Sequence, residues 1–288
     1  MSSPRALAPM TLGTNLALYD TNDQVVNDAG AQRALLRMGV PIVRMPFRAF
    51  LPDAFELRAL WVIRSLGAIP LVIVHGPADA QALADDRHAI ELVQQVFGRS
   101  EVYVEFGNEP DLAGYSASAY TASWNQVVPA LKAMAPTYKF AGPVTFQADP
   151  AYVAYFDQYA VPRPDVNTWH EYVCYPYSAD AYCLQHLANW GAHIQATNTA
   201  VAAAIGAPLP VMITEWNLDA THDARYANSA FMEQWVAAAA HELATDRTFG
   251  LVAAMQYCAS NNSDLSLIGA TGAATPEGQV FQVVASGA

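Results

Sequence analysis

Short apolar runs alternate along the chain with longer stretches in which apolar residues recur at helical spacing. The short runs are rich in β-branched and aromatic residues, which indicates β-strands, and eight of them begin at residues 12, 40, 69, 102, 140, 166, 211 and 250. Glycines that commonly end helices follow the stretches between them, at Gly39, Gly67, Gly98 and Gly206. Eight strands that alternate with helices predict parallel β/α repeats, closed into a (β/α)8 barrel of the TIM-barrel class.

The composition bounds the number of domains and the class of partner. The 288 residues, 53% of them hydrophobic, suffice for one large core, so we expect a single domain over residues 1–288 without an accessory domain. A net charge of −12 opposes binding to nucleic acid or to an anionic membrane surface. The longest apolar runs, such as Ile69 to Val74, are far shorter than the ~20 residues of a membrane-spanning helix. We expect neither of these partners, and a monomer is favoured.

The amino end and the three cysteines bear on the compartment. Met1 to Met10 has no apolar core of a secretory signal, so the protein is either cytoplasmic or secreted with its leader removed. Cys174 and Cys183 are close enough in sequence to bridge one loop, whereas Cys258 belongs to a predicted strand. Three ordinary thiols are favoured over a disulfide, because this number in a chain of this size suits a reduced compartment.

Two predicted strands end on a glutamate. In the stretch EVYVEFGNEPD, from Glu101 to Asp111, apolar residues alternate with polar ones up to Gly107, and Glu109 follows. Pro110 disfavours helical geometry at Glu109, so we expect this residue to be extended where the strand becomes a loop. The stretch VMITEWN likewise leads to Glu215. The carboxyl ends of parallel strands meet at one rim of a barrel, where active sites are built.

Both stretches resemble motifs of the retaining clan A glycoside hydrolases. Gly107 to Pro110 is similar to the clan's acid/base motif on barrel strand four, and Val211 to Asn217 is similar to its nucleophile strand, the seventh. The two glutamates are 215 − 109 = 106 residues apart, which fits three repeats of about 35 residues. The motif is closest to families 39 and 79 and is also similar to family 5. Those two families usually carry an added β-sandwich, for which this chain is too short.

The resemblance implies a role for each glutamate and for several neighbours. Glu109 is expected to be the acid/base and Glu215 the nucleophile, and the alternative is that both are solvated rim carboxylates. Other carboxylates could take these places: Glu105, Glu171 and Asp111. The resemblance also implies that Asn108 binds the sugar 2-hydroxyl. It implies that Tyr172 donates a hydrogen bond to the nucleophile carboxylate, and that Arg44 places a positive charge beside that carboxylate.

Histidines and aromatic residues complete the candidate site. Alternation places His170 on the same strand face as Tyr172, and His75 ends the third strand, although each could be structural. Arg48, in the loop after the second strand, is expected to be solvated. Sugar rings pack on aromatic side chains, and the candidates for such contacts, which could equally be core residues, are Trp124, Trp169, Trp216 and Tyr257. Trp216 is the strongest of these, and the clan's usual tryptophan on strand eight is not visible.

The sequence therefore predicts a retaining glycoside hydrolase that cleaves O-glycosidic bonds of an oligo- or polysaccharide by a two-glutamate double displacement. The alternatives are a non-catalytic carbohydrate-binding barrel and a metal-dependent barrel enzyme of unrelated chemistry. No cofactor and no metal site are expected, because His186 and His193 lie two helical turns apart and no Gly-rich phosphate loop is present. Carboxyl groups about 5 to 5.5 Å apart would suit direct attack by one of them.

Overall fold

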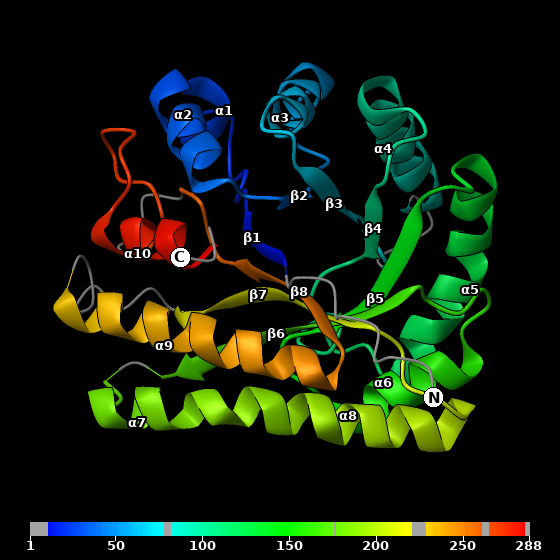
Figure 1. Cartoon of the computed structure of the whole chain (residues 1–288). Helices are drawn as coiled ribbons and strands as arrows, with labels where there is room; N and C mark the ends of the chain where they lie inside the picture. The colour runs from blue at the N-terminus through cyan, green and yellow to red at the C-terminus, as the bar shows by residue number, and fades with distance from the viewer. Residues whose placement is uncertain (1–10, 78–81, 176, 221–228, 261–264, 286–288) are drawn as a thin grey trace, which may run out of the picture.

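The computed structural model describes residues 11–77, 82–175, 177–220, 229–260 and 265–285. Eight parallel strands pair in sequence order, and β1 pairs with β8 to close the barrel (Figure 1). This arrangement confirms the predicted (β/α)8 fold. The strands are β1 (Thr11–Asn15), β2 (Ile42–Pro46), β3 (Ile69–Val74), β4 (Tyr103–Phe106), β5 (Lys139–Thr145), β6 (Val166–Cys174), β7 (Val211–Asp219) and β8 (Leu251–Gln256).

Helices surround the barrel, because each strand's outward face is apolar and must be covered (Figure 1). Several begin at a side chain that accepts a hydrogen bond from the first turn, as Ser116, Asp149 and Ser229 do. The α-helices are α1 (Gln24–Asn27), α2 (Ala29–Met38), α3 (Asp53–Ser65), α4 (Ala82–Phe97), α5 (Ala117–Met134), α6 (Pro150–Tyr159), α7 (Asp180–Gln185), α8 (Asn189–Ile205), α9 (Ala230–Asp246) and α10 (Pro276–Ala285).

Two apolar clusters form the core. The larger one fills the space between strands and helices. The smaller one lies inside the barrel and consists of Ile42, Leu71, Ala141, Val166, Met212, Ala253 and Met255. Along β2 and β7 a member of this cluster, Ile42 or Met212, comes before a buried polar residue, Arg44 or Glu215. The barrel interior is therefore apolar near the amino ends of the strands and polar near the carboxyl ends.

A disulfide joins Cys174, the last residue of β6, to Cys183 in α7. The expectation of three free thiols is therefore wrong, because the loop folds back and brings the two Cα atoms to 5.5 Å. Cys258 is a buried free cysteine. Met1 to Met10, on which the leader prediction rests, lies outside the described residues. Within the described part of the chain, every helix is too short or too polar to cross a bilayer.

Candidate active site

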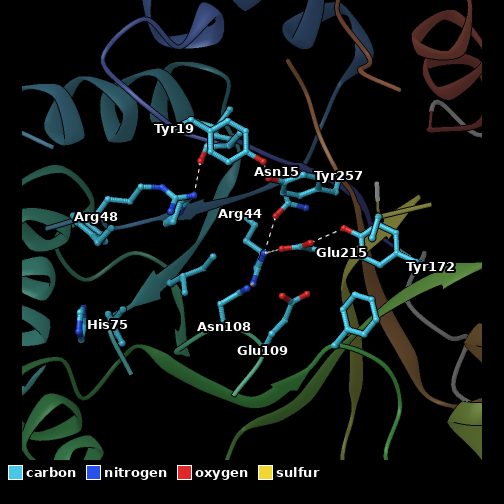
Figure 2. A pocket seen from close by; sticks show the side chains of 18 residues that line it. Asn15, Tyr19, Arg44, Arg48, His75, Asn108, Glu109, Tyr172, Glu215 and Tyr257 are labelled. Atoms are coloured by element: carbon cyan, nitrogen blue, oxygen red, sulfur yellow. Dashed lines mark hydrogen bonds and ion pairs between the residues drawn. The ribbon is translucent and has the colours of Figure 1, made fainter. Parts of the chain in front are cut away.

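A cavity of about 410 Å³ opens at the carboxyl ends of the strands. Figure 2 shows polar side chains from several strands and loops pointing into it. Seven residues singled out from the sequence line this cavity: Arg44, His75, Asn108, Glu109, Tyr172, Glu215 and Tyr257. An eighth, His170, is buried and contacts Glu109. The structure thus brings together side chains that are up to 213 residues apart in sequence, since 257 − 44 = 213.

Glu215 is held on β7 by two donors. Arg44 Nη1 lies 2.5 Å from its Oε1, and the Tyr172 hydroxyl donates to its Oε2 at 2.6 Å (Figure 2). Burial alone would raise the pKa of this carboxyl group, but the charge that His170 carries when protonated, the charge of Arg44 and the hydrogen bonds from Tyr172 and Arg44 outweigh it. The net pKa is below the ordinary value, so Glu215 is held ionised at neutral pH.

Arg44 is the centre of the network, and it is 1% exposed. Its Nε donates to Glu105 Oε2 at 2.6 Å, and its Nη1 also donates to Asn15 Oδ1 at 3.1 Å. Its Nη2 donates to Asn108 Oδ1 at 2.7 Å. The two carboxylates outweigh burial and raise the pKa of Arg44. The planar guanidinium, whose donors point in fixed directions, can therefore fix residues of β1, β4 and β7 together with the loop after β4.

Glu109 occupies a different environment. Its side chain is 23% exposed, and its Oε1 lies 2.8 Å from His170 Nδ1. Its φ of 47° lies in the left-handed region, so the expectation of an extended backbone is wrong. The backbone N–H of Glu109 instead donates to the Val144 carbonyl at 3.0 Å, which holds the turn. Backbone strain of this kind clusters at functional sites.

His170 connects the two glutamates and is completely buried. Its Nδ1 is 3.6 Å from Glu215 Oε2, and its Nε2 is 3.4 Å from Arg44 Nη2. Arginine can only donate, so in the neutral form of the ring Nε2 accepts from Arg44 and the Nδ1–H donates to Glu109. One ligand atom each from Glu109, His170 and Glu215 lie within 4.8 Å of one another.

The tryptophans predicted to contact sugar do not reach the cavity. Trp216 is fully buried and packs against Trp190, Trp235 and Phe281 on the outer side of the strand, so its prediction as a stacking platform is wrong. It follows Glu215 directly, and successive residues of a strand point to opposite faces. The same rule turns Trp169 away from His170, and Trp169 donates instead to Glu171.

The remaining candidates divide between the cavity and the structure around it. Trp124 is buried against Phe106 and Phe156 behind the barrel. Tyr257 does reach the cavity, where its hydroxyl contacts that of Tyr19. His75 is exposed at the cavity wall.

Among the other carboxylates, Glu105 lies beneath Arg44, Glu171 pairs with His193, and Asp111 accepts from the Phe146 backbone. The rival carboxylates are thus all occupied by structural partners.

Sequence reasoning missed several residues that line the cavity: Asn15, Tyr19 and Phe146. Asn15 was detectable, because it is a polar residue within an apolar strand, as Arg44 is. Tyr19 and Phe146 come from loops and carried no such signal. Arg48, expected to be solvated, is instead half-buried and lines the cavity. Its Nη2 donates to the Ala17 carbonyl at 2.9 Å, which draws the side chain inward.

No protein-family model matches the sequence, and no curated protein matches it. Solved structures do match its fold. A glucosidase from Croceicoccus marinus is 16% identical, with a TM-score of 0.71 over 95% of this chain and 65% of that one. The chain therefore spans about two thirds of that glucosidase. The structures that match include several glycoside hydrolases with (β/α)8 barrels.

Two further structures match over almost their whole length. A family 5 broad-specificity endoglucanase from an uncultured bacterium is 14% identical, with a TM-score of 0.61 over 98% of this chain and 94% of that one. A family 128 oligosaccharide-binding protein from Trichoderma gamsii is 13% identical, with a TM-score of 0.58 over 100% of this chain and 98% of that one. At such identities the likeness shows the fold alone. The resemblance to families 39 and 79 stays a prediction.

Proposed function

We propose that the protein is a glycoside hydrolase that cleaves O-glycosidic bonds of an oligo- or polysaccharide with net retention. The observation that carries the proposal is the pair formed by Glu109, in the loop after β4, and Glu215, within β7. An oxygen of Glu109 and an oxygen of Glu215 are no more than 4.8 Å apart, in two unlike environments. Retaining enzymes place their carboxyl groups about 5 to 5.5 Å apart, whereas inverting enzymes leave room for a water molecule.

In the first step, Glu215 Oε attacks the anomeric carbon while Glu109 gives its proton to the glycosidic oxygen. The bond between anomeric carbon and leaving oxygen breaks, and a glycosyl ester of Glu215 forms. In the second step, Glu109 takes a proton from water, whose oxygen attacks the same carbon and releases Glu215. Arg44 and the Tyr172 hydroxyl support this role because they hold Glu215 ionised and fix its orientation.

Asn108 is placed to act on the transition state. Its Oδ1 accepts from Arg44, which leaves its amide N–H groups without a partner among the described residues and directed at the cavity. They are suited to donate to the sugar 2-hydroxyl, a hydrogen bond that strengthens as the oxocarbenium-like state develops. His170 donates to Glu109 and thereby fixes the direction of its carboxyl group. We assign His170 a positioning role.

The oligosaccharide-binding protein with this fold makes non-catalytic carbohydrate binding the second candidate. A metal-dependent reaction is less well supported. The Glu109, His170 and Glu215 atoms that could bind a cation already lie beside the Arg44 guanidinium, which is 2.5 Å from Glu215. A second positive charge there would be repelled.

The test begins with a panel of aryl glycosides and polysaccharides and continues with two variants of the active enzyme. Glu215→Ala should abolish turnover, because no covalent intermediate can form. Glu109→Ala should still react with glycosides of good leaving groups, and added azide should release a glycosyl azide of retained configuration. Azide rescue of Glu215→Ala should give the inverted azide. The reverse stereochemistry in the two variants would show that the two roles are exchanged.

A folded protein that binds oligosaccharides but cleaves no member of the panel would instead identify a binding module. Thermal unfolding of each variant checks that the loss of turnover is not a loss of fold. Added EDTA should leave turnover unchanged, and loss of activity that a divalent metal restores would favour the metal-dependent alternative.

A further inference from the structure

Asn15, the last residue of β1, is a buried polar residue of the cavity lining. Its Oδ1 accepts from Arg44 Nη1 at 3.1 Å (Figure 2). Its Nδ2 donates to the carbonyl of Thr214 at 3.0 Å and to that of Gln256 at 3.2 Å. Because arginine can only donate and a carbonyl oxygen can only accept, these contacts fix the orientation of the amide group. Both ends of the side chain are therefore occupied by the protein itself.

β7 has an irregular register at Thr214, the residue before the proposed nucleophile. Toward β6, the paired residues of β7 pass from Ile213 directly to Glu215. Toward β8, they pass from Ile213 to Trp216. Thr214 is thus skipped in both ladders, which is the mark of a β-bulge. Bulges change the direction in which the following side chains point and recur next to active sites, so the direction of Glu215 depends on this one.

The hydrogen bond from Asn15 to Thr214 crosses the inside of the barrel. β8 lies between β1 and β7, so ladder pairing cannot join these two strands. The same amide group also bonds to Gln256, the last residue of β8, and therefore spans all three strands. The carbonyl that it holds belongs to the peptide bond between Thr214 and Glu215. Asn15 thus restrains the backbone at the bulge.

The other end of the amide group acts on the side chain of Glu215. Arg44 Nη1, which donates to Asn15 Oδ1, also lies 2.5 Å from Glu215 Oε1. A shift of Asn15 would therefore change the direction of the guanidinium as well as the position of the bulge. The backbone and the carboxylate of Glu215 are both tied to one buried side chain.

We infer that Asn15 is a positioning residue, which sets the direction of Glu215 by holding the bulge at Thr214 and the guanidinium of Arg44 in fixed relation. The inference rests on the proposed function and adds a residue to it. Asn15 acts here through Glu215 and not on the substrate, because both hydrogens of its amide group have carbonyl acceptors.

Asn15 could alternatively serve only to close the barrel. Closure has other support, since residues 11–14 of β1 already pair with residues 253–256 of β8. A purely structural role would lower stability and leave the pH profile of the folded variant unchanged. A positioning role would lower kcat and move the limb of the profile that reports Glu215. The measurements are therefore kcat, KM, a pH profile with an aryl glycoside that the protein cleaves, and urea unfolding.

Asn15→Asp tests the role with little change of shape. The new carboxylate cannot donate to the Thr214 carbonyl, and its negative charge competes with Glu215 for Arg44. We expect kcat to fall by about 100-fold with KM changed by less than about 3-fold. Added negative charge raises the pKa of Glu215, so the acidic limb of kcat/KM should move upward by about 1 pH unit.

Asn15→Ala removes the hydrogen bonds without adding a charge. It should lower kcat by about 10- to 100-fold and move the acidic limb less than Asn15→Asp does. Asn167→Ala is the matched control, because Asn167 is equally buried on β6 but donates to Asp157 outside the cavity. It should lose stability and keep both kcat and the limb. The titratable groups that surround Glu215 are unchanged in all three variants: Arg44, Glu109, His170, Tyr172, Tyr257 and Cys258.

The outcomes separate this inference from the proposed function. Folded Asn15 variants that keep the wild-type kcat and acidic limb overturn the inference and leave the hydrolase intact, and so does an equal loss of kcat in Asn167→Ala. If the wild-type protein cleaves nothing, the proposed function fails, and crystal structures of the wild-type protein and Asn15→Ala decide the geometry. The Glu215 carboxyl group should be displaced by about 1 Å or more in the variant, which is enough to impair catalysis. An undisplaced carboxyl group overturns the inference.

Discussion

A single guanidinium organises the chemistry of this barrel at the scale of residues. Arg44 contacts Asn15, Glu105, Asn108 and Glu215, so that residues of β1, β7 and the end of β4 with its following loop share one rigid planar group. Lysine could not replace it, because one ammonium cannot reach in these directions at once. The proposed nucleophile and the proposed 2-hydroxyl ligand are thus positioned by the same side chain.

The Tyr172 hydroxyl provides the second donor to Glu215, and its removal should change the pH dependence of turnover. Its hydrogen bond lowers the pKa of Glu215, so Tyr172→Phe should raise that pKa and move the acidic limb of kcat/KM upward by about 1 pH unit. The rate at the optimum should fall by about 10-fold or more. The measurement is a pH profile with an aryl glycoside of good leaving group.

Tyr138→Phe is the matched control, since Tyr138 is also buried but donates to the Gly98 carbonyl away from the cavity. It should leave the acidic limb where it is. An unchanged limb in Tyr172→Phe would contradict the assignment of Glu215 as the group that must be ionised.

Much of the candidate site could be predicted from residue types at strand ends. Glu109, Glu215, Tyr172 and Arg44 stand out because each is polar beside apolar strand residues, and their convergence follows from parallel strands sharing one rim. Trp216 shows the limit. Its position next to Glu215 predicted a contact with sugar, but alternation along the strand directs its side chain to the core outside the barrel. Which of two adjacent residues points inward depends on the barrel's register, which a single chain does not reveal.

At the scale of elements, the ends of β3 and β4 approach each other so closely that two glycines are required. Gly76 has φ +80° and Gly107 has φ +84°. A Cβ on Gly76 would lie 2.4 Å from the Cα of Gly107, a backbone atom that cannot move away freely. Gly107 directly precedes Asn108 and Glu109, so the loop after β3 determines where these two side chains stand.

Gly76→Ala should therefore reduce turnover by more than its loss of folding stability would explain. The methyl group pushes Gly107 and misplaces Glu109, and a displacement of about 1 Å costs about 100-fold in rate. Gly67→Ala is the matched control, because Gly67 has φ +72° and nothing within 4 Å of an added Cβ. Both variants carry the penalty of a left-handed alanine, about 1 kcal/mol. Kinetics and urea unfolding of both proteins separate the two effects, and equal turnover in the two variants would contradict this role of Gly76.

The strand pattern could be predicted almost completely at this scale, but the loops could not. All eight predicted strands exist, and the bounds of β3, Ile69–Val74, are those read from the sequence. β7 extends to Asp219 rather than ending at Glu215, because pairing with β6 continues beyond the apolar run. The disulfide and the left-handed backbone of Glu109 depend on how loops fold against their neighbours. Contacts between residues distant in sequence decide such features, and local pattern carries little information about them.

At the scale of the whole molecule, several acidic side chains are buried outside the cavity and form no ion pair with another described residue. Burial is the largest cause in each case and raises the pKa of Glu56, Asp86 and Asp246 to about 7 and that of Asp157 to about 6. Both carboxyl oxygens of Asp246 lack a hydrogen-bond partner among the residues that the structure describes. These groups favour the protonated form in the folded protein, in contrast to Glu215, whose pKa is lowered.

These raised pKa values fix the sign of the pH dependence of stability. Between roughly pH 4 and pH 7 the folded protein binds more protons than the unfolded chain, so the free energy of unfolding falls as pH rises through this window. The opposite contribution of Glu215 lies below its ordinary value of 4.5 and does not enter above it. We therefore expect unfolding in urea to require about 2 kcal/mol less free energy at pH 8.0 than at pH 5.5.

Asp246→Asn tests the origin of this pH dependence. It replaces a fully buried carboxyl group by an uncharged amide of the same shape, so the cost of ionising this group at high pH disappears. The difference in unfolding free energy between pH 5.5 and pH 8.0 should shrink by about 1 kcal/mol. Asp20→Asn, at an exposed position, should leave the difference unchanged. A free energy of unfolding that instead increases toward pH 8.0 in the wild-type protein would contradict this account. It would mean that these carboxyl groups are ionised in the folded protein.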